Sequence, residues 1–98
     1  MSKVKIKEII EPQYYDLTLR YSLKSFPKNK THGQYATWLF KKLKLRSRAN
    51  FNGPYEQRSR MSIYINQVPE KEKRRICNKA KLINDGVFRE ILVYKAPK

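Results

Sequence analysis

The stretch Lys41–Ile65 organises the fold expected of this chain and reads KKLKLRSRANFNGPYEQRSRMSIYI. It holds seven Lys or Arg residues and one acid, Glu56. The central cations recur on every second residue, first as Lys44, Arg46 and Arg48 and then as Arg58 and Arg60. Side chains of a strand alternate between its two faces, so each set is expected to form a cationic row. Asn, Gly and Pro between the sets favour a turn, and the pattern predicts a basic β-hairpin over residues 44–62 with Phe51 and Tyr55 at its tip.

The one-sided charge of this stretch favours contact with nucleic acid. A hairpin charged only for solubility is the alternative, but such a surface mixes acids and bases, whereas a phosphate-binding surface excludes acids. The whole chain of 98 residues carries a formal net charge of +15, which attracts polyanions. The candidate RNA-binding residues are the cations, one amide and two aromatic residues of the stretch: Lys41, Lys42, Lys44, Arg46, Arg48, Asn50, Phe51, Tyr55, Arg58 and Arg60.

Length and composition set the class of protein. Ninety-eight residues suit one modest core, so a basic arm over residues 1–13 and a single α+β domain over 14–98 are expected. A hydrophobic content of 40% argues against wholesale disorder. Cys77 is the only cysteine, which excludes an internal disulfide and fits a reducing compartment. No apolar run approaches the ~20 residues that span a bilayer, and no membrane partner is expected.

Periodicity predicts the first two elements. Residues 16–24 read as a strand whose apolar residues alternate with polar ones: Leu17, Leu19, Tyr21 and Leu23. A helix is expected to follow from Thr31, as N-cap, to about Leu43, with Trp38 and Leu39 in the core. In the second strand of the hairpin, the residues expected on the buried face are Met61, Ile63 and Ile65.

The rest of the chain supplies a second helix and a last strand. Pro69 is expected at the first helical position, and Asn84-Asp85-Gly86 is expected to stop the helix, with Gly86 in the left-handed conformation. The last strand, 87–94, is apolar on both faces, which favours a central place in the sheet, and Tyr94 is expected near the core. The element order predicts a ferredoxin-like split βαβ fold: an antiparallel sheet with two helices on one face and an extended basic β-hairpin.

The residues predict no enzyme, no cofactor, no metal and no small-molecule substrate. His32 is the only histidine and lies in a polar stretch without a nearby cysteine or paired carboxylates, so an exposed loop or cap position is expected. The three glycines do not have the spacing of a phosphate-binding loop. Among the seven tyrosines, the candidates for stacking on unpaired bases are Tyr14, Tyr15 and Tyr55.

Several of these segments resemble, in order, the family of small-subunit ribosomal protein ten. Leu19–Phe26 (LRYSLKSF) is similar to the family's opening strand, and Leu45-Arg46-Ser47 to its Leu-Arg-Ser segment. Tyr55–Arg60 (YEQRSR) resembles its aromatic-Glu-x-Arg-Thr-His run, and Ile63–Lys71 the strand and helix start that follow. The resemblance covers about residues 15–95. The chain lacks the family's Gly-Pro-Ile-Pro-Leu-Pro stretch and has Arg60 where a His is usual, which indicates a divergent lineage.

The resemblance implies a non-enzymatic constituent of the head of the small ribosomal subunit. Its partners would be the rRNA of that subunit, reached through the basic hairpin, and neighbouring head proteins. The abundance of Lys, Ile, Asn, Tyr and Phe is typical of an AT-rich genome, which favours a mitochondrial over a cytoplasmic ribosome. The alternative is a free-standing protein of a phage, plasmid or other mobile element that binds single-stranded nucleic acid, with Phe51 and Tyr55 as stacking platforms.

Overall fold

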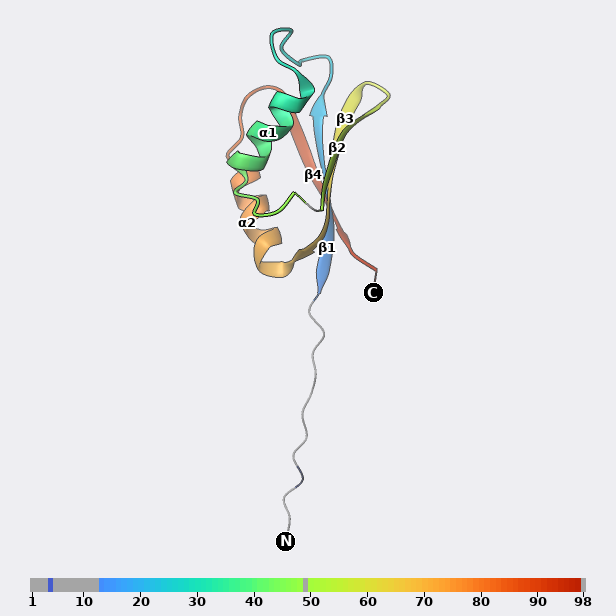
Figure 1. Ribbon diagram of the computed structural model, residues 1–98, viewed down its shortest axis with the longest axis vertical. Coiled ribbons are helices and arrows are strands. Elements are labelled where there is room, and N and C mark those ends of the chain that lie inside the picture. The colour runs from blue at the N-terminus through green and yellow to red at the C-terminus, as the bar shows by residue number, and fades with distance from the viewer. Residues whose placement is uncertain (1–3, 5–12, 49, 98) are drawn as a thin grey trace.

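The computed structural model describes residues 4, 13–48 and 50–97. Its elements in chain order are β1 (Tyr14–Ser22), α1 (His32–Lys42), β2 (Phe51–Gln57), β3 (Arg60–Pro69), α2 (Glu70–Ala80) and β4 (Phe88–Lys95). The strands form one antiparallel sheet in the order β2-β3-β1-β4, and both helices cover the same face of it (Figure 1). The predicted ferredoxin-like split βαβ fold is confirmed. The basic arm predicted over residues 1–13 lies outside the described residues, apart from Val4 and Gln13.

Alternation along β1 and β3 builds the core as predicted. Leu17, Leu19 and Tyr21 are buried toward the helices, and in the antiparallel register they lie opposite Ile65, Ile63 and Met61, which are also buried. The side chains between them point to the other face, which the helices leave uncovered and which we call the open face. The register makes each buried pair a cross-strand neighbour, so one apolar layer faces the helices.

Helix α1 begins where its capping residues predict. The Oγ1 of Thr31 accepts the N–H of Gln34 at 3.1 Å, and Oε1 of Gln34 accepts the N–H of Thr31 at 3.0 Å. Leu39 is fully buried as expected, but the prediction for Trp38 is wrong because its side chain is 38% exposed. The buried stripe of the helix is centred on Ala36 and Leu39, so Trp38 lies at its rim, stacked on a neighbouring tyrosine ring.

The position of the hairpin turn differs from the prediction. The chain reverses at Arg58 and Ser59, and residues 51–57 form β2, not a tip. Arg58 has φ 59°, the left-handed value that a two-residue hairpin turn requires at its first position. Gly53 lies inside β2, at a break in its register with β3, and a Cβ there would come within 2.9 Å of the carbonyl oxygen of Ser62. The Asn-Gly-Pro signal therefore marks an irregularity within a strand.

Strand β4 is an edge strand and not the central strand that its sequence predicts. Among the described strands, it pairs with β1 alone. Its apolar residues divide between the two faces: Ile91 lies opposite Leu19 on the helix-covered face, and Leu92 lies opposite Thr18 on the open face. Tyr94 is 53% exposed, so its predicted place near the core is wrong. The strand has apolar residues on both faces because the open face of the sheet is itself partly apolar, and not because the strand is central.

Three smaller predictions also change. Pro69 is the N-cap of α2, one position before the first helical residue. The helix ends at Ala80, before Asn84-Asp85-Gly86, although Gly86 does have a left-handed φ of 76°. His32 is not an exposed loop residue. A 2.9 Å hydrogen bond joins its Nδ1 to the hydroxyl of Tyr21, and its ring stacks on Phe26 at 4.1 Å between centroids. Phe26, in the segment between β1 and α1, also contacts the rings of Tyr21 and Tyr35, so the imidazole is partly buried in a group of aromatic side chains.

Candidate nucleic-acid interface

The carboxylates of the described residues are almost all engaged inside the protein. Glu70 pairs with Lys73 and Arg74, each at 3.1 Å, and hydrogen bonds from Tyr15 and then Lys73 lower the pKa of Glu70 to about 2. Further internal contacts hold Glu72, Glu90, Asp16 and Asp85. Few acids are left to neutralise the other cations, so these remain available to an external anion.

One group of exposed cations lies where α1 passes to β2. Lys41 and Lys42 are in the last turn of α1, and Lys44, Arg46 and Arg48 follow in residues 43–48 and 50, which we call the connecting segment. All five side chains are exposed. The connecting segment is not a strand, so the alternating cationic row predicted for it is wrong. Its Lys44 has φ 56°, which an extended strand does not allow.

Contacts with the helices and with β3 hold the connecting segment in place. The guanidinium of Arg75 donates to the carbonyl oxygens of Leu43 at 3.0 Å and Lys44 at 2.6 Å. At the far end, the N–H of Asn66 donates to the carbonyl oxygen of Asn50 at 3.0 Å. The guanidinium of Arg48 lies 4.6 Å from the centre of the Phe40 ring, a cation–π contact. These contacts fix the backbone that carries the cations.

A second group of cations surrounds the hairpin turn. Arg58 is in the turn and Arg60 follows on the open face, and together with Arg20 and Gln57 they line a shallow cleft of about 430 Å³. β2 separates this group from the connecting segment, and its seven residues at ~3.3 Å each span roughly 20 Å. The candidate cations therefore form two separate sites and not the single basic hairpin that the sequence predicts.

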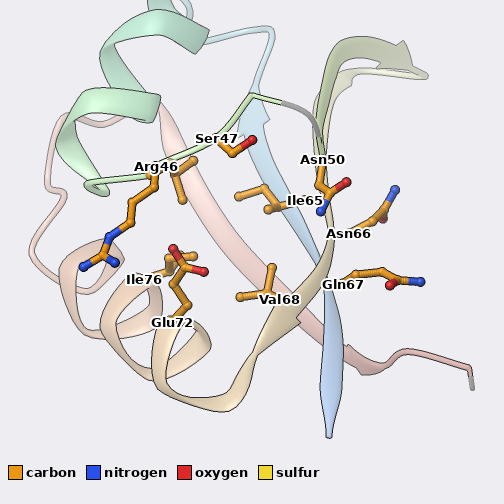
Figure 2. A pocket seen from close by; sticks show the side chains of 10 residues that line it. Arg46, Ser47, Asn50, Ile65, Asn66, Gln67, Val68, Glu72 and Ile76 are labelled. Carbon is orange, nitrogen blue, oxygen red and sulfur yellow. The ribbon is translucent and has the colours of Figure 1, made fainter. Parts of the chain in front are cut away.

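A small pocket lies beneath the connecting segment, between β3 and α2 (Figure 2). Its volume is about 180 Å³, and Ile65, Val68 and Ile76 point into it. Arg46 and Glu72 lie at its rim, and Arg75 Nη2 pairs with the Glu72 carboxylate at 3.1 Å. The mouth of the pocket is therefore polar and its interior is apolar. The apolar side chains that point into it carry no group that could act in catalysis.

The aromatic residues predicted to stack on RNA bases differ in how exposed they are. Phe51 is partly buried against the core, with its ring edge-on to Phe40 at 5.4 Å, so part of its ring is already in contact inside the protein. Tyr15 is also engaged, because Lys73 Nζ lies 4.4 Å from its ring centre. Tyr14 is partly exposed at the start of β1. Tyr55 is 52% exposed on the open face, where sequence reasoning missed its neighbour Tyr64, 5.9 Å away between ring centres.

Arg20 was not among the predicted RNA-binding residues, although the sequence shows which face of β1 carries it. Thr18, Arg20 and Ser22 alternate with the buried residues of β1, so they had to lie together on the other face. Which residues of the other strands join them depends on sheet order and register. Neither quantity is visible in a single sequence.

Within the described residues, no group of three or more His, Cys, Asp or Glu side chains is placed to hold a metal ion. No helix of that part of the chain is long and apolar enough to cross a membrane. Comparisons of this chain with protein-family models, with curated proteins and with solved structures found no match.

Proposed function

We propose that this protein is a non-enzymatic RNA-binding constituent of the head of the small ribosomal subunit. The observation that carries the proposal is the basic connecting segment: exposed cations on a backbone fixed by Arg75 and Asn66, while the nearby Glu72 is paired internally. Cations on a rigid backbone suit phosphates at fixed positions in folded RNA, where contacts to phosphate and sugar recognise shape and not sequence. The resemblance to small-subunit ribosomal protein ten supports the ribosomal assignment.

The proposal includes partners and compartment. The chain has a net charge of +15, so its cationic side chains repel one another unless an anion neutralises them. RNA phosphates would supply that neutralisation, which favours a permanent complex with RNA over a transient one. Neighbouring head proteins are the other expected partners, and a mitochondrial ribosome is favoured by the composition. No membrane or small-molecule substrate takes part.

Co-sedimentation with small ribosomal subunits at moderate salt tests this function. The parent chain is expected to sediment with the subunits, and a triple variant, Lys44→Ala, Arg46→Ala and Arg48→Ala, is expected to stay largely in the supernatant. A matched control removes the same charge from exposed lysines of the segment between β1 and α1: Lys24→Ala, Lys28→Ala and Lys30→Ala. Equal loss in both variants would point to net charge alone and contradict a localised site.

A free-standing binder of single-stranded nucleic acid is the second candidate. The rigid connecting segment favours it as well, because a free-standing binder needs a site that is already formed before RNA arrives. The same sedimentation experiment separates the two functions. Tight binding to short single strands without association to ribosomal subunits would favour the second candidate.

A further inference from the structure

We infer that the open face of the sheet binds one unpaired RNA nucleotide, with its base against Tyr55 and Tyr64 and its phosphate in the arginine cleft beside the hairpin turn. The inference rests on the proposed RNA-binding function and deepens it, because this site is separate from the connecting segment.

The register aligns the residues of this site in a row across all four strands. Tyr55 lies opposite Ser62, Ser62 opposite Arg20, and Arg20 opposite Glu90. The next row toward the hairpin turn pairs Gln57 with Arg60. Two residues along a strand span about 7 Å, so the tyrosine lies one row from the cationic cleft. That separation suits the base and phosphate of a single nucleotide.

The aromatic half of the site is exposed and ready to stack. The rings of Tyr55 and Tyr64 lie 5.9 Å apart at 36°, and half of Tyr55 is open to solvent. Exposing the apolar surface of a large aromatic ring to water is unfavourable, and a partner that covers the ring removes this penalty. Aromatic side chains on an exposed sheet are platforms on which unpaired bases stack.

The cationic half carries surplus positive charge. Three arginines line the cleft, and the carboxylate of Glu90 lies 3.2 Å from Arg20 Nη1 and 4.0 Å from Arg60 Nη1. One carboxylate against three guanidinium groups leaves the cleft cationic. The planar fork of donors on an arginine matches the oxygens of a phosphate, which makes a phosphate the fitting ligand.

Two unsatisfied polar atoms lie between the halves. Arg20 Nε and Ser62 Oγ are buried, and neither has a hydrogen-bond partner among the described residues. Arg20 and Ser62 are cross-strand neighbours, and Ser62 also lies opposite Tyr55. Buried polar atoms without partners are uncommon and costly in folded proteins. The hydrogen-bonding capacity of these two atoms, at the junction of ring and cleft, is therefore not used within the described residues.

The charge of this surface favours nucleic acid over an apolar protein surface. An apolar protein surface would cover the tyrosines but would leave the arginine cleft without counter-charge, and desolvated unpaired charge opposes binding. An unpaired nucleotide satisfies both halves at once.

Titration of the full-length chain with hexauridylate, followed by amide chemical shifts, tests the inference. The largest shifts are expected at Ser62 and Tyr64. Tyr55→Leu is expected to weaken binding by roughly 5- to 150-fold, the equivalent of ~1–3 kcal/mol per stacked base. Tyr94→Leu is the matched control, since Tyr94 is equally exposed on the same face but on the opposite edge strand. An abasic hexamer is expected to bind the cleft weakly and to lose its dependence on Tyr55.

The outcomes separate this inference from the proposed function. Unchanged affinity in Tyr55→Leu, with loss only in the connecting-segment triple variant, would overturn the inference and leave the proposed function standing. Equal losses in Tyr55→Leu and Tyr94→Leu would overturn the location of the site. Shifts on the open face by a ribosomal protein but not by hexauridylate would identify a protein as the occupant and overturn the inference. Binding of hexauridylate at Tyr55 without association to ribosomal subunits would support the inference and contradict the proposed function.

Discussion

The hydroxyl of Tyr35 in α1 donates a hydrogen bond of 2.7 Å to Oδ2 of Asp85, fifty positions later in the chain. The other oxygen of the same carboxylate accepts the N–H groups of Val87 and Phe88, each at 2.9 Å. Burial opposes ionisation of Asp85, but the hydrogen bonds from Phe88, Tyr35 and Val87 outweigh it and lower the pKa of this carboxyl. This residue therefore ties the first helix to the start of the last strand.

Tyr35→Phe is expected to lower the free energy of unfolding by ~1–3 kcal/mol, because it removes a hydrogen bond to a charged acceptor while keeping the ring in place. Denaturant unfolding measures the change. Tyr94→Phe is the control, since an exposed hydroxyl should contribute nothing measurable. Equal stability of both variants would show that the link to Asp85 contributes little.

Stability is expected to fall as the pH rises from 10 to 12. Burial raises the pKa of Tyr21 from 10.0 to about 12, so the folded protein keeps this hydroxyl protonated while the unfolded chain releases its proton. The contribution is fully present below pH 10 and is lost as the pH approaches 12. Unfolding measured across this range should fall more steeply for the parent than for Tyr21→Phe. Parallel curves would contradict the prediction.

Leu39→Ala and Trp38→Ala are expected to differ sharply although the residues are adjacent. Leu39 is fully buried, so its truncation leaves a cavity and should cost ~2–5 kcal/mol. Trp38 lies at the rim of α1 and should cost less, because much of its ring already faces water. Thermal or denaturant unfolding of the two variants gives the comparison, and a larger loss for Trp38→Ala would mean that α1 docks with a different face.

The connecting segment is expected to supply part of the salt dependence of RNA binding. Each lost phosphate contact should reduce the slope of log affinity against log salt by roughly 0.7–0.9, so the triple variant of Lys44, Arg46 and Arg48 should lose about 2–3. Titrations at several salt concentrations measure the slope. The triple variant of Lys24, Lys28 and Lys30 should keep the parental slope, and a parental slope in the first variant would place the contacts elsewhere.

Gly53→Ala is expected to destabilise the fold by more than Gly86→Ala. Gly53 has φ 122° and its added Cβ would meet the Ser62 carbonyl oxygen at 2.9 Å, whereas Gly86 has φ 76° and open space around it. Gly86→Ala should therefore cost only the ~1–2 kcal/mol of a left-handed conformation. Chemical denaturation of both variants tests the order, and its reversal would mean that β2 can shift away from β3.

The sequence predicts those parts of the fold that local chemistry decides. The alternation of Leu17, Leu19 and Tyr21 defines β1, and the pairing of Thr31 with Gln34 defines the start of α1, because each acts within a few residues. The element order then predicts the split βαβ arrangement. The prediction for Trp38 is wrong because the apolar spacing of a helix does not show where the edges of its buried face lie.

The candidate site was less predictable because longer-range geometry decides it. Asn-Gly-Pro is a stronger turn signal than Arg58-Ser59. The pairing of β2 with β3 nevertheless places the turn at Arg58-Ser59. This single shift packs the partly buried Phe51 against the core and divides the cations between two sites. The open-face row of Tyr55, Ser62 and Arg20 comes from three strands, so only the register brings it together.

The break in β2 at Gly53 and Pro54 also governs how copies of this chain meet one another. β2 is an outer strand, and an outer strand with a regular row of free N–H and C=O groups invites edge-to-edge aggregation. Pro54 has no N–H to offer, and the register interruption between Asn52 and Tyr55 bends the row that a second copy would have to match. The irregularity in β2 is therefore expected to oppose edge-to-edge pairing between two copies of this chain.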